Sequence, residues 1–463
     1  MKTYDVLVLG GGTAGSAAAK AAHATGARTA MFNDGELGGL CILRGCMPTK
    51  TLLHSAHLVH HASHHATPGV EHLSPGHDFA TIMANKDAKV ARFQRAKIES
   101  IEQGGYEVID ARARFVGPDE VEAGGERYRF TKGAVIATGS VQRVPPIPGL
   151  DRVRYLTSDD LMMLTRAPES VVVLGSGAVG VEFAQFFARL GTEVELVTRR
   201  GIFEDVDPDI SAEMRLAIAD EPRLNLHEHL SATHVEAVDG GVRVDCEGPD
   251  GTRLRVSGEQ LVLATGRRAN VDNLGLEHAG VAMDGDRVRC SDDMQTTNPK
   301  VFVAGDATGN RLLLHVANWE GHTAGLGAAG VPDRRAVEQR LHVEVIFYDP
   351  VMATVGLSEA AARGAGHDVV TARVRFPETG RAITMDVQHG VMKLVADRGT
   401  GEILGCQLLG PRADDLVHIV SSIMYFRGTA AQMLEMPWYH PTLSEVLLSL
   451  ARDVENQRGR PRA

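Results

Sequence analysis

Two short runs of valine and leucine stand out in the hydrophobic pattern of the chain, because each ends at a glycine-rich turn. Residues 6–9 and 171–174 are apolar at every position, which is typical of strands buried on both faces. The alanine-rich segment 16–24 and the apolar segment that ends at Leu190 follow the turns and favour helices. The pattern therefore predicts the same strand–turn–helix unit twice.

The glycines of both turns have the spacing Gly-x-Gly-x-x-Gly, which in this context is typical of dinucleotide binding. Such glycines let the backbone approach a pyrophosphate, and the N-terminus of the following helix balances its charge. Similar apolar strands close the two copies at 134–139 and 261–266. We therefore expect an α/β protein with two Rossmann-like domains. The glycines concerned are Gly10, Gly12 and Gly15 in the first copy and Gly175, Gly177 and Gly180 in the second.

A different pattern begins near residue 340, where strand-like runs at 341–348, 391–396 and 403–409 have helical segments between and after them. This pattern is typical of an α+β domain, often one used for assembly. A proline-rich linker at 145–149 leads out of the first nucleotide-binding domain. The expected division is 1–148 for that domain, 149–268 for the second nucleotide-binding domain, 269–337 for a return to the first, central domain, and 338–463 for the interface domain.

Cys41 and Cys46 are the chain's one close pair of cysteines. In a regular helix, residues five apart lie about 7.5 Å apart along the axis, whereas a disulfide needs Cα atoms roughly 4.4–6.8 Å apart. The turn must therefore be distorted, and glycines at 38, 39 and 45 permit this. Pro48 fits the first turn of a following helix, so Cys46 would lie at a helix N-terminus, which stabilises a thiolate.

The alternative is that Cys41 and Cys46 are buried structural residues or half of a metal site. A second Cys-x-x-Cys pair is missing from the sequence, which argues against zinc, and the pair favours redox chemistry. Five cysteines, mostly single, suit a reducing cytoplasm. A net charge of −11 argues against nucleic-acid or membrane-surface binding. The first residues lead directly into a predicted strand, and no apolar run is long enough to span a bilayer, so we expect a soluble, cytoplasmic protein without a signal peptide.

The order of these motifs resembles that of the flavin-dependent pyridine nucleotide–disulfide oxidoreductases, which include lipoamide dehydrogenase, glutathione reductase and mercuric reductase. The resemblance covers essentially the whole chain and includes further motifs at 137–140, 264–267, 301–306 and 440–445. It implies that the first domain binds FAD, that the second binds NAD(P)H, and that the C-terminal domain forms a homodimer with an active site shared across the interface.

Carried onto matching positions, the resemblance implies a role for each candidate residue. Cys41 would be the interchange thiol that attacks the substrate disulfide, and Cys46 the thiolate that faces the flavin and forms a charge-transfer complex. His440 would act as acid–base for the leaving thiol, oriented by Glu445. Glu445 also fits a capping box that begins at Thr442, which is the alternative for this residue. The remaining residues implied are Lys50 paired with Glu182 beside the flavin, Thr138, Gly139 and Asp306 on FAD, and Gly266 on the nicotinamide nucleotide.

Two positions depart from the family pattern. Asn33 stands where a glutamate usually binds the adenosine ribose, and Asp34 follows it; either residue has an acceptor for a ribose hydroxyl. In the second copy, Thr198 is followed by Arg199 and Arg200 instead of a carboxylate. Two arginines suit a 2′-phosphate and favour NADPH over NADH. The alternatives are a solvated turn and NADH binding, which Gly180 favours.

Histidines are concentrated just after the dithiol. On a helix several of them share one face, and imidazoles at such spacing are competent ligands for transition metals. The preferred interpretation is a polar helix face toward the substrate channel or solvent, with no resident metal. The histidines are His54, His57, His60, His61, His64 and His65, followed by His72 and His77.

The leading hypothesis is an FAD-dependent NADPH:disulfide oxidoreductase acting on a small-molecule disulfide. Residues 313–321 are similar to a stretch of lipoamide dehydrogenase, whereas Trp438 and Tyr439 are bulky enough to stack on an aromatic disulfide. Arg44, between the cysteines, would either attract an anion and lower a thiol pKa or point to water. The alternatives are the lipoamide dehydrogenase subunit of a multienzyme complex, a mercuric-reductase-like metal-ion reductase, and a metal-handling protein that uses the histidines.

Overall fold

The computed structural model describes residues 1–65, 67–74 and 76–459. The chain forms two compact units, each of which draws on several segments. The first unit comprises Met1–Thr51, Met83–Val144 and Gly266–Val337. The second unit comprises Leu52–Ile82, Pro145–Thr265 and Glu338–Ala463.

The first unit is built on a sheet with strand order β3-β2-β1-β6-β5-β4, in which β18 also pairs with β6. The pairs β1–β2, β1–β6, β2–β3 and β6–β18 are parallel. Val6, Leu7, Val8 and Leu9 are at most 1% exposed, as expected for a strand covered on both faces. The strands are β1 (Lys2–Leu9), β2 (Thr29–Asn33), β3 (Glu107–Asp110), β4 (Ala113–Gly117), β5 (Glu120–Ala123), β6 (Glu126–Ile136) and β18 (Val301–Val303), with the short pairs β7 (Ser140–Gln142) and β15 (Arg267–Ala269), and β16 (Met283–Asp284) and β17 (Arg287–Val288).

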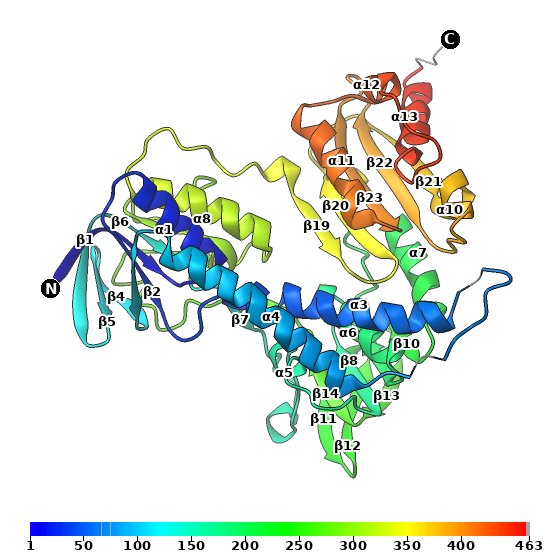
Figure 1. Cartoon of the computed structure of the whole chain (residues 1–463), viewed down its shortest axis with the longest axis horizontal. Helices are drawn as coiled ribbons and strands as arrows, with labels where there is room; N and C mark the ends of the chain where they lie inside the picture. The colour runs from blue at the N-terminus through cyan, green and yellow to red at the C-terminus, as the bar shows by residue number, and fades with distance from the viewer. Residues whose placement is uncertain (66, 75, 460–463) are drawn as a thin grey trace. The chain divides into compact units, whose positions relative to one another are not determined.

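Helices α1 (Thr13–Ala24) and α8 (Leu314–Ala328) lie side by side in the first unit (Figure 1). Their close approach depends on glycine: a Cβ at Gly321 or Gly325 would lie 2.3 Å from the carbonyl oxygen of Ala14 or Ala18, respectively. Short helices α2 (Gly39–Leu43) and η2 (Gly305–Thr308) complete this unit.

The second unit repeats the nucleotide-binding topology, with parallel strands in the order β10-β9-β8-β14. An antiparallel sheet of β11, β12 and β13 follows in the chain. The elements are η1 (Leu150–Arg152), α5 (Ser158–Leu161), β8 (Ser170–Leu174), α6 (Ala178–Arg189), β9 (Glu193–Val197), α7 (Pro208–Ala219), β10 (Leu224–His227), β11 (Ser231–Val238), β12 (Gly241–Glu247), β13 (Arg253–Gly258) and β14 (Gln260–Leu263).

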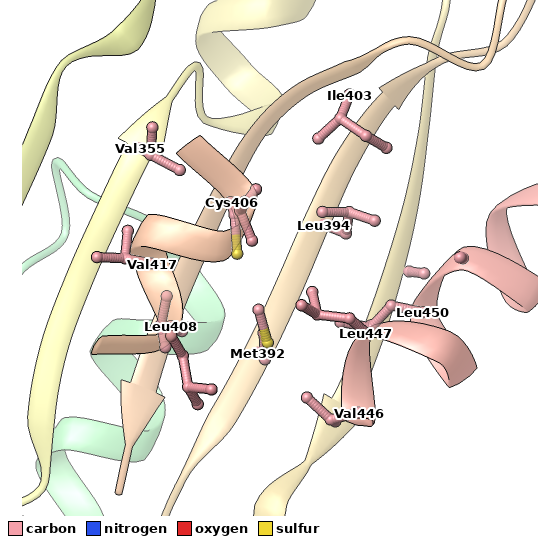
Figure 2. Close-up of a cluster of buried hydrophobic side chains, with 14 of the residues drawn as sticks. Val355, Met392, Leu394, Ile403, Cys406, Leu408, Val417, Val446, Leu447 and Leu450 are labelled. Carbon is pink, nitrogen blue, oxygen red and sulfur yellow. The ribbon is translucent and has the colours of Figure 1, made fainter. Parts of the chain in front are cut away.

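The C-terminal part of the second unit is an antiparallel sheet with order β19-β20-β23-β22-β21. Val417 of α11, Leu447 of α13 and strand residues such as Leu394 belong to one cluster of fully buried side chains (Figure 2). This α+β pattern agrees with the sequence. The elements are η3 (Gln339–Leu341), β19 (Val343–Ile346), β20 (Val351–Gly356), α9 (Glu359–Gly364), β21 (Val369–Arg375), η4 (Phe376–Glu378), α10 (Gly380–Ile383), β22 (Val391–Asp397), β23 (Ile403–Gly410), α11 (Ala413–Tyr425), α12 (Ala430–Glu435) and α13 (Val446–Gln457).

Two long helices, α3 (Cys46–Ser63) and α4 (Phe79–Glu102), each contain a boundary between the units. Residues 52–82 therefore group with the second unit, whereas the expected division placed them in 1–148. The four-segment division itself stays a prediction. Among the described residues, none of the helices is both long and apolar enough to cross a membrane.

A buried ionic network joins the C-terminal part of α3 to the rest of the second unit. The Arg189 side chain, 3% exposed, pairs with Glu221 at 3.0 Å and with Asp349 at 2.9 Å. On α3, His60 Nδ1 lies 3.5 Å from a Glu221 oxygen, and His61 Nε2 lies 3.3 Å from an Asp349 oxygen. These partners explain why this part of α3 belongs to the second unit.

The same network keeps two histidines of α3 neutral. Burial, reinforced by the positive charge of Arg189, lowers the pKa of His57 to about 4 and that of His60 to about 3. The neighbouring Glu221 carboxylate does not reverse this effect, because Arg189 already compensates its charge. A lowered imidazole pKa means that the unfolded chain binds more protons below about pH 6.5, so folding stability falls as the pH drops through that value.

His57→Gln should therefore flatten the loss of stability between pH 6.5 and pH 4.5. The expected difference in slope is up to about 1.4 kcal/mol per pH unit, the full value for one proton taken up on unfolding. Urea unfolding of wild type and variant at several pH values measures it. His54→Gln, at an exposed position on the same helix, is the control and should keep the wild-type slope; equal slopes for all three proteins would contradict the prediction.

Candidate active site

In the first nucleotide turn, between β1 and α1, close backbone packing leaves no room for a Cβ at two of the glycines, whereas the third has free space beside it. A Cβ at Gly10, where φ is +119°, would lie 2.2 Å from the Ala137 carbonyl oxygen. A Cβ at Gly15 would lie 1.7 Å from the Gly10 carbonyl oxygen. At Gly12 the nearest atom would be the Gly39 Cα at 3.9 Å. The turn thus leaves room at its middle glycine, where a pyrophosphate approaches in a Rossmann fold.

The second turn, between β8 and α6, has the same design. A Cβ at Gly175, where φ is +108°, would lie 2.4 Å from the Ala264 carbonyl oxygen. A Cβ at Gly180 would lie 1.8 Å from the Gly175 carbonyl oxygen. A Cβ at Gly177 would meet nothing within 4 Å. Gly266, which follows β14 with φ of +95°, accepts a hydrogen bond from the Arg143 N–H through its carbonyl oxygen.

One buried polar atom after β6 in the first unit has no partner in the described part of the protein. Thr138 Oγ1 is buried and has no hydrogen-bond partner among the described residues, and Gly139 follows with φ of +74°. A buried hydroxyl without a partner is costly, so this atom fits a ligand that supplies the missing hydrogen bond. The Thr138 carbonyl oxygen already accepts from Asn270 at 3.1 Å.

Asp306, in η2, forms a hydrogen-bonded chain with the segments next to it. Its carboxylate accepts from Ser140 Oγ at 2.6 Å, and Ser140 Oγ accepts from Arg267 Nε at 2.9 Å. Burial raises the pKa of Asp306, against the opposing hydrogen bond from Ser140 and charge of Arg267. Glu320 of α8 accepts from the Gly305 N–H at 2.8 Å, and burial raises the pKa of Glu320 to about 7.

At the end of β2, Asn33 and Asp34 differ in availability. The Asn33 amide donates to the Gly35 carbonyl oxygen at 2.7 Å, and its Oδ1 lies against Gly11. Asp34 is exposed and has no hydrogen bond within the described ranges. Asp34 is therefore the better placed of the two to accept a hydrogen bond from a ribose.

The two cysteines come together because the chain leaves the helical path between them. Helix α2 ends at Leu43, and Cys46 is the first residue of α3. Gly38 and Gly39 have φ of +139° and +75°. Gly45 does not adopt the positive φ that we expected of it. It is needed for close packing instead, because a Cβ there would lie 3.0 Å from the Leu40 carbonyl oxygen and 3.1 Å from Cys41 Cα.

The Cys41 thiol hydrogen-bonds with Cys46, and the two cysteines are not joined by a disulfide. This hydrogen bond, together with burial and the negative charge that Cys46 can carry, raises the pKa of Cys41, against the opposing charge of Lys50. Cys46 is exposed at the helix N-terminus, where the dipole favours a thiolate. Arg44, between them, is exposed. The pair therefore combines a protonated thiol with a sulfur placed to be ionised.

The redox turn touches the first nucleotide turn. A Cβ at Gly39 would lie 2.9 Å from the Gly12 Cα, so backbone packs directly on backbone at this point. Lys50 also belongs to the first unit, whereas Glu182 belongs to the second. Glu182 is 2% exposed and accepts from the Phe347 N–H at 2.8 Å. The pairing of Lys50 with Glu182 stays a prediction.

His440 and Glu445 form a hydrogen-bonded pair in the second unit. His440 Nδ1 lies 3.0 Å from both carboxylate oxygens of Glu445, while the His440 side chain is 75% exposed. Glu445 also accepts from the Thr442 N–H at 3.0 Å. These two hydrogen bonds lower the pKa of Glu445. Glu445 thus orients His440 and also binds the Thr442 N–H, but α13 begins at Val446 with Glu445 as its N-cap, so Thr442 does not open a capping box as the alternative expected.

The two arginines after β9 are both exposed. Arg200 pairs with Asp205, whereas Arg199 makes no ion pair within the described ranges. Thr198 Oγ1 accepts from Ser176 Oγ of the second nucleotide turn at 2.7 Å. This contact ties the end of β9 to the turn in front of α6.

Comparisons with known proteins agree with this geometry. Residues 4–321 match the family model described as pyridine nucleotide-disulphide oxidoreductase, and residues 343–451 match the dimerisation domain of the same family. The chain belongs to this family. It is therefore an oxidoreductase that acts on sulfur groups and uses FAD and NAD(P)H, and its α/β fold with a C-terminal dimerisation domain confirms the fold expected from the sequence.

Relatives in the family differ in their activities. The chain is 33% identical to mercuric reductase of Streptomyces lividans over 454 residues, which cover 96% of this chain and 94% of the relative. It is 32% identical to dihydrolipoyl dehydrogenase of Thermus scotoductus over 468 residues, which cover 99% and 98%. HOCl-induced flavoprotein disulfide reductase RclA from Escherichia coli shares the fold, with a TM-score of 0.84, 24% identity, and coverage of 97% of this chain and 99% of that one.

Some residues that shape the site carried no role in the sequence expectations. Ser140 and Arg267 organise Asp306, although both lie far from it in the chain. Asn270 and Glu320 fix the backbone next to Thr138 and Asp306. The motifs 137–140 and 264–267 contain Ser140 and Arg267, but only tertiary structure shows that they meet.

The two kinds of glycine should respond differently to alanine. Gly177→Ala adds a Cβ to open space, so the melting temperature should stay within about 1 °C while the KM for the nicotinamide nucleotide rises roughly tenfold or more, because the Cβ occupies the space of the pyrophosphate. Gly180→Ala clashes with backbone and should destabilise the fold by about 1–3 kcal/mol. Thermal melts and initial rates distinguish the two; an unchanged KM in Gly177→Ala would contradict the proposed use of this turn.

Proposed function

We propose that this protein is an FAD-dependent NADPH:disulfide oxidoreductase that reduces a small-molecule disulfide through Cys41 and Cys46. One observation carries the proposal: the Cys41 thiol is hydrogen-bonded to Cys46 at the start of α3, in a turn that packs on the first nucleotide turn. On one side the dithiol contacts the first nucleotide turn, to which we assign FAD, and on the other side Cys46 is exposed.

The first unit fits FAD. Gly12 leaves space for the pyrophosphate, Thr138 Oγ1 has an unused hydrogen-bonding capacity, and Asp34 is available to the ribose. Asp306, positioned by Ser140, would accept a hydrogen bond from the ribityl chain. When bound, FAD accepts hydride from the nicotinamide and delivers two electrons to the Cys41–Cys46 disulfide.

The reduced cysteines then carry out two thiol–disulfide exchanges. The Cys41 thiolate attacks one sulfur of the substrate, which breaks the substrate disulfide, forms a mixed disulfide and releases one thiolate. The Cys46 thiolate attacks Cys41 Sγ, releases the second thiolate and restores the Cys41–Cys46 disulfide. Two protons convert the released thiolates to thiols, so each turnover consumes one NADPH and one further proton.

Because the pKa of Cys41 is raised, this cysteine needs a base before it can attack. We assign that role to His440, whose Nδ1 is held by Glu445 and whose Nε2 is therefore free to exchange a proton with sulfur. The dimerisation domain that carries His440 supports a site completed by the second subunit of a homodimer.

The preference for NADPH is inferred from the end of β9. Arg199 is exposed and without an ion pair among the described residues, so its guanidinium is available to a 2′-phosphate, whereas Arg200 is partly engaged by Asp205. The absence of a carboxylate at Thr198 removes the group that would repel that phosphate. Single, scattered cysteines beyond the redox pair support a reducing, cytoplasmic location.

Reduction of mercuric ion is the second candidate, because relatives named mercuric reductase cover nearly the whole chain at up to 33% identity. Thiolates are strong ligands for soft metal ions, and the reduced Cys41–Cys46 pair would bind such an ion. Lipoamide is a third substrate candidate, supported by relatives named dihydrolipoyl dehydrogenase at up to 32% identity.

Anaerobic titration of the holoenzyme with NADPH and NADH, followed by turnover with a panel of small disulfides, lipoamide and Hg(II), tests the proposal. We expect NADPH to reduce the flavin with at least tenfold higher kcat/KM than NADH, and at least one small disulfide to be turned over. Cys41→Ser should keep flavin reduction and lose more than 99% of disulfide turnover. Preference for NADH with lipoamide, or turnover of Hg(II) alone, would replace the proposed function with one of the alternatives.

His440→Gln should slow disulfide reduction at pH 7 by roughly 10²–10⁴-fold. The deficit should shrink as the pH rises, because the raised pKa of Cys41 leaves little thiolate at neutral pH and more at alkaline pH. Stopped-flow measurement of flavin reduction by NADPH is the control and should give the wild-type rate. A variant whose pH profile parallels that of wild type would show that His440 is not the base.

A further inference from the structure

The C-terminal half of α4 lies against two segments near the first nucleotide turn. Gln94 Nε2 donates to the Leu37 carbonyl oxygen at 3.1 Å, and Lys97 Nζ donates to Ser16 Oγ at 2.6 Å. Gln94 and Lys97 are three residues apart, so they share one face of the helix. All four residues belong to the first unit. This face of α4 therefore covers the start of α1 and the chain that leads into α2.

Ser16 is part of the first turn of α1 and is tied to the nucleotide turn. Its N–H donates to the Gly12 carbonyl oxygen at 3.0 Å, and its Oγ donates to the Thr13 carbonyl oxygen at 3.1 Å. The Ser16 side chain is buried. Through this one side chain, Lys97 reaches the helix N-terminus at which the first nucleotide turn ends.

Lys97 has a positive charge that the described part of the chain does not balance. Its side chain is half-buried, and it makes no ion pair with a described residue. Burial, reinforced by the positive charge of Lys20 on α1, lowers the pKa of Lys97. A buried ammonium group normally has a carboxylate beside it, because desolvation of an unpaired charge is costly. The missing counter-ion therefore needs an explanation.

A bound nucleotide would supply that counter-ion. The pyrophosphate of FAD is negatively charged, Gly12 leaves space for it, and the N–H groups at the start of α1 point toward that space. A lysine binds phosphate as a point charge, so it does not need the paired geometry of an arginine. The position of Lys97 beside the first turn of α1 fits this use.

We propose that Lys97 is a further FAD-binding residue, whose ammonium group, held by Ser16, balances the negative charge of the pyrophosphate at the start of α1. This inference rests on the assignment of FAD to the first nucleotide turn. No motif indicated Lys97, which is 81 positions from Ser16 along the chain.

The alternative is that Lys97 only ties α4 to α1 through its hydrogen bond to Ser16. The two roles predict opposite effects of Lys97→Met, which keeps an apolar side chain and removes the charge. A purely structural tie would be lost with or without FAD, so the variant would be less stable in both states. If the charge serves FAD, its removal relieves the FAD-free chain of an unpaired cation and weakens only the FAD-bound state.

The rate of FAD release from the full-length holoenzyme, measured by ultrafiltration at intervals after dilution, tests the proposal. Lys97→Met should release FAD roughly tenfold faster than wild type or more, since loss of one partner of a charge pair acts mainly on dissociation. Lys97→Arg keeps the charge and should release FAD within about threefold of the wild-type rate. Lys89→Met, at an exposed lysine of the same helix, is the matched control and should behave as wild type.

Two further measurements separate the charge from a structural tie. Raising the salt concentration from about 0.05 M to about 0.5 M should speed FAD release from wild type more than from Lys97→Met, because salt screens the ion pair. After removal of FAD, Lys97→Met should melt at or above the wild-type temperature. Unchanged FAD release from Lys97→Met, an equal acceleration in Lys89→Met, or a lower melting temperature of the FAD-free Lys97→Met would each overturn the proposal.

Gly12→Ala tests the placement of FAD separately. The added Cβ would enter the open space of the turn without a clash, since the nearest protein atom would be 3.9 Å away. Fast FAD release from Gly12→Ala with wild-type release from Lys97→Met would overturn the role of Lys97 alone. Wild-type release from both variants would also overturn the assignment of FAD to this turn.

Discussion

The chemistry that we propose for this protein depends on a hydrogen bond between the sulfur atoms of Cys41 and Cys46. Cys41 reaches Cys46 because the chain breaks its helix between Leu43 and Cys46. The contact divides two roles between identical side chains: it holds the proton on Cys41, while the start of α3 favours negative charge on Cys46. Attack by Cys41 then requires a base, and the oriented His440 is the residue that we propose for this role.

Steric contact fixes where a nucleotide can lie relative to those sulfurs. In both nucleotide turns the outer glycines are held against backbone oxygens of the same fold, and the middle glycine is left open. The first turn has an additional contact, because Gly39 of the redox turn rests on Gly12. Within the first unit, the position of the dithiol is therefore determined by the same few backbone atoms that shape the nucleotide site.

The elements around the two glycine turns could be predicted from sequence, since local pattern and final burial agree there: Val6–Leu9 is apolar throughout and buried throughout. The break between the cysteines was predictable for a similar reason, because geometry alone excluded a regular helix. The Ser140–Asp306 contact was not predictable, because its partners are 166 positions apart and share no periodicity. The spacing of the histidines along α3 also did not predict which of them would face the Asp349–Arg189 ion pair.

The Arg189 network also limits how the chain can be recombined with its relatives. Arg189 and Glu221 come from the second nucleotide-binding segment, whereas Asp349 comes from the dimerisation domain. A chimaera that took its C-terminal segment from a relative lacking this aspartate would bury a guanidinium with only one of its two counter-ions, which is costly in a protein interior. A recombined chain therefore has to keep Asp349 together with Arg189 and Glu221.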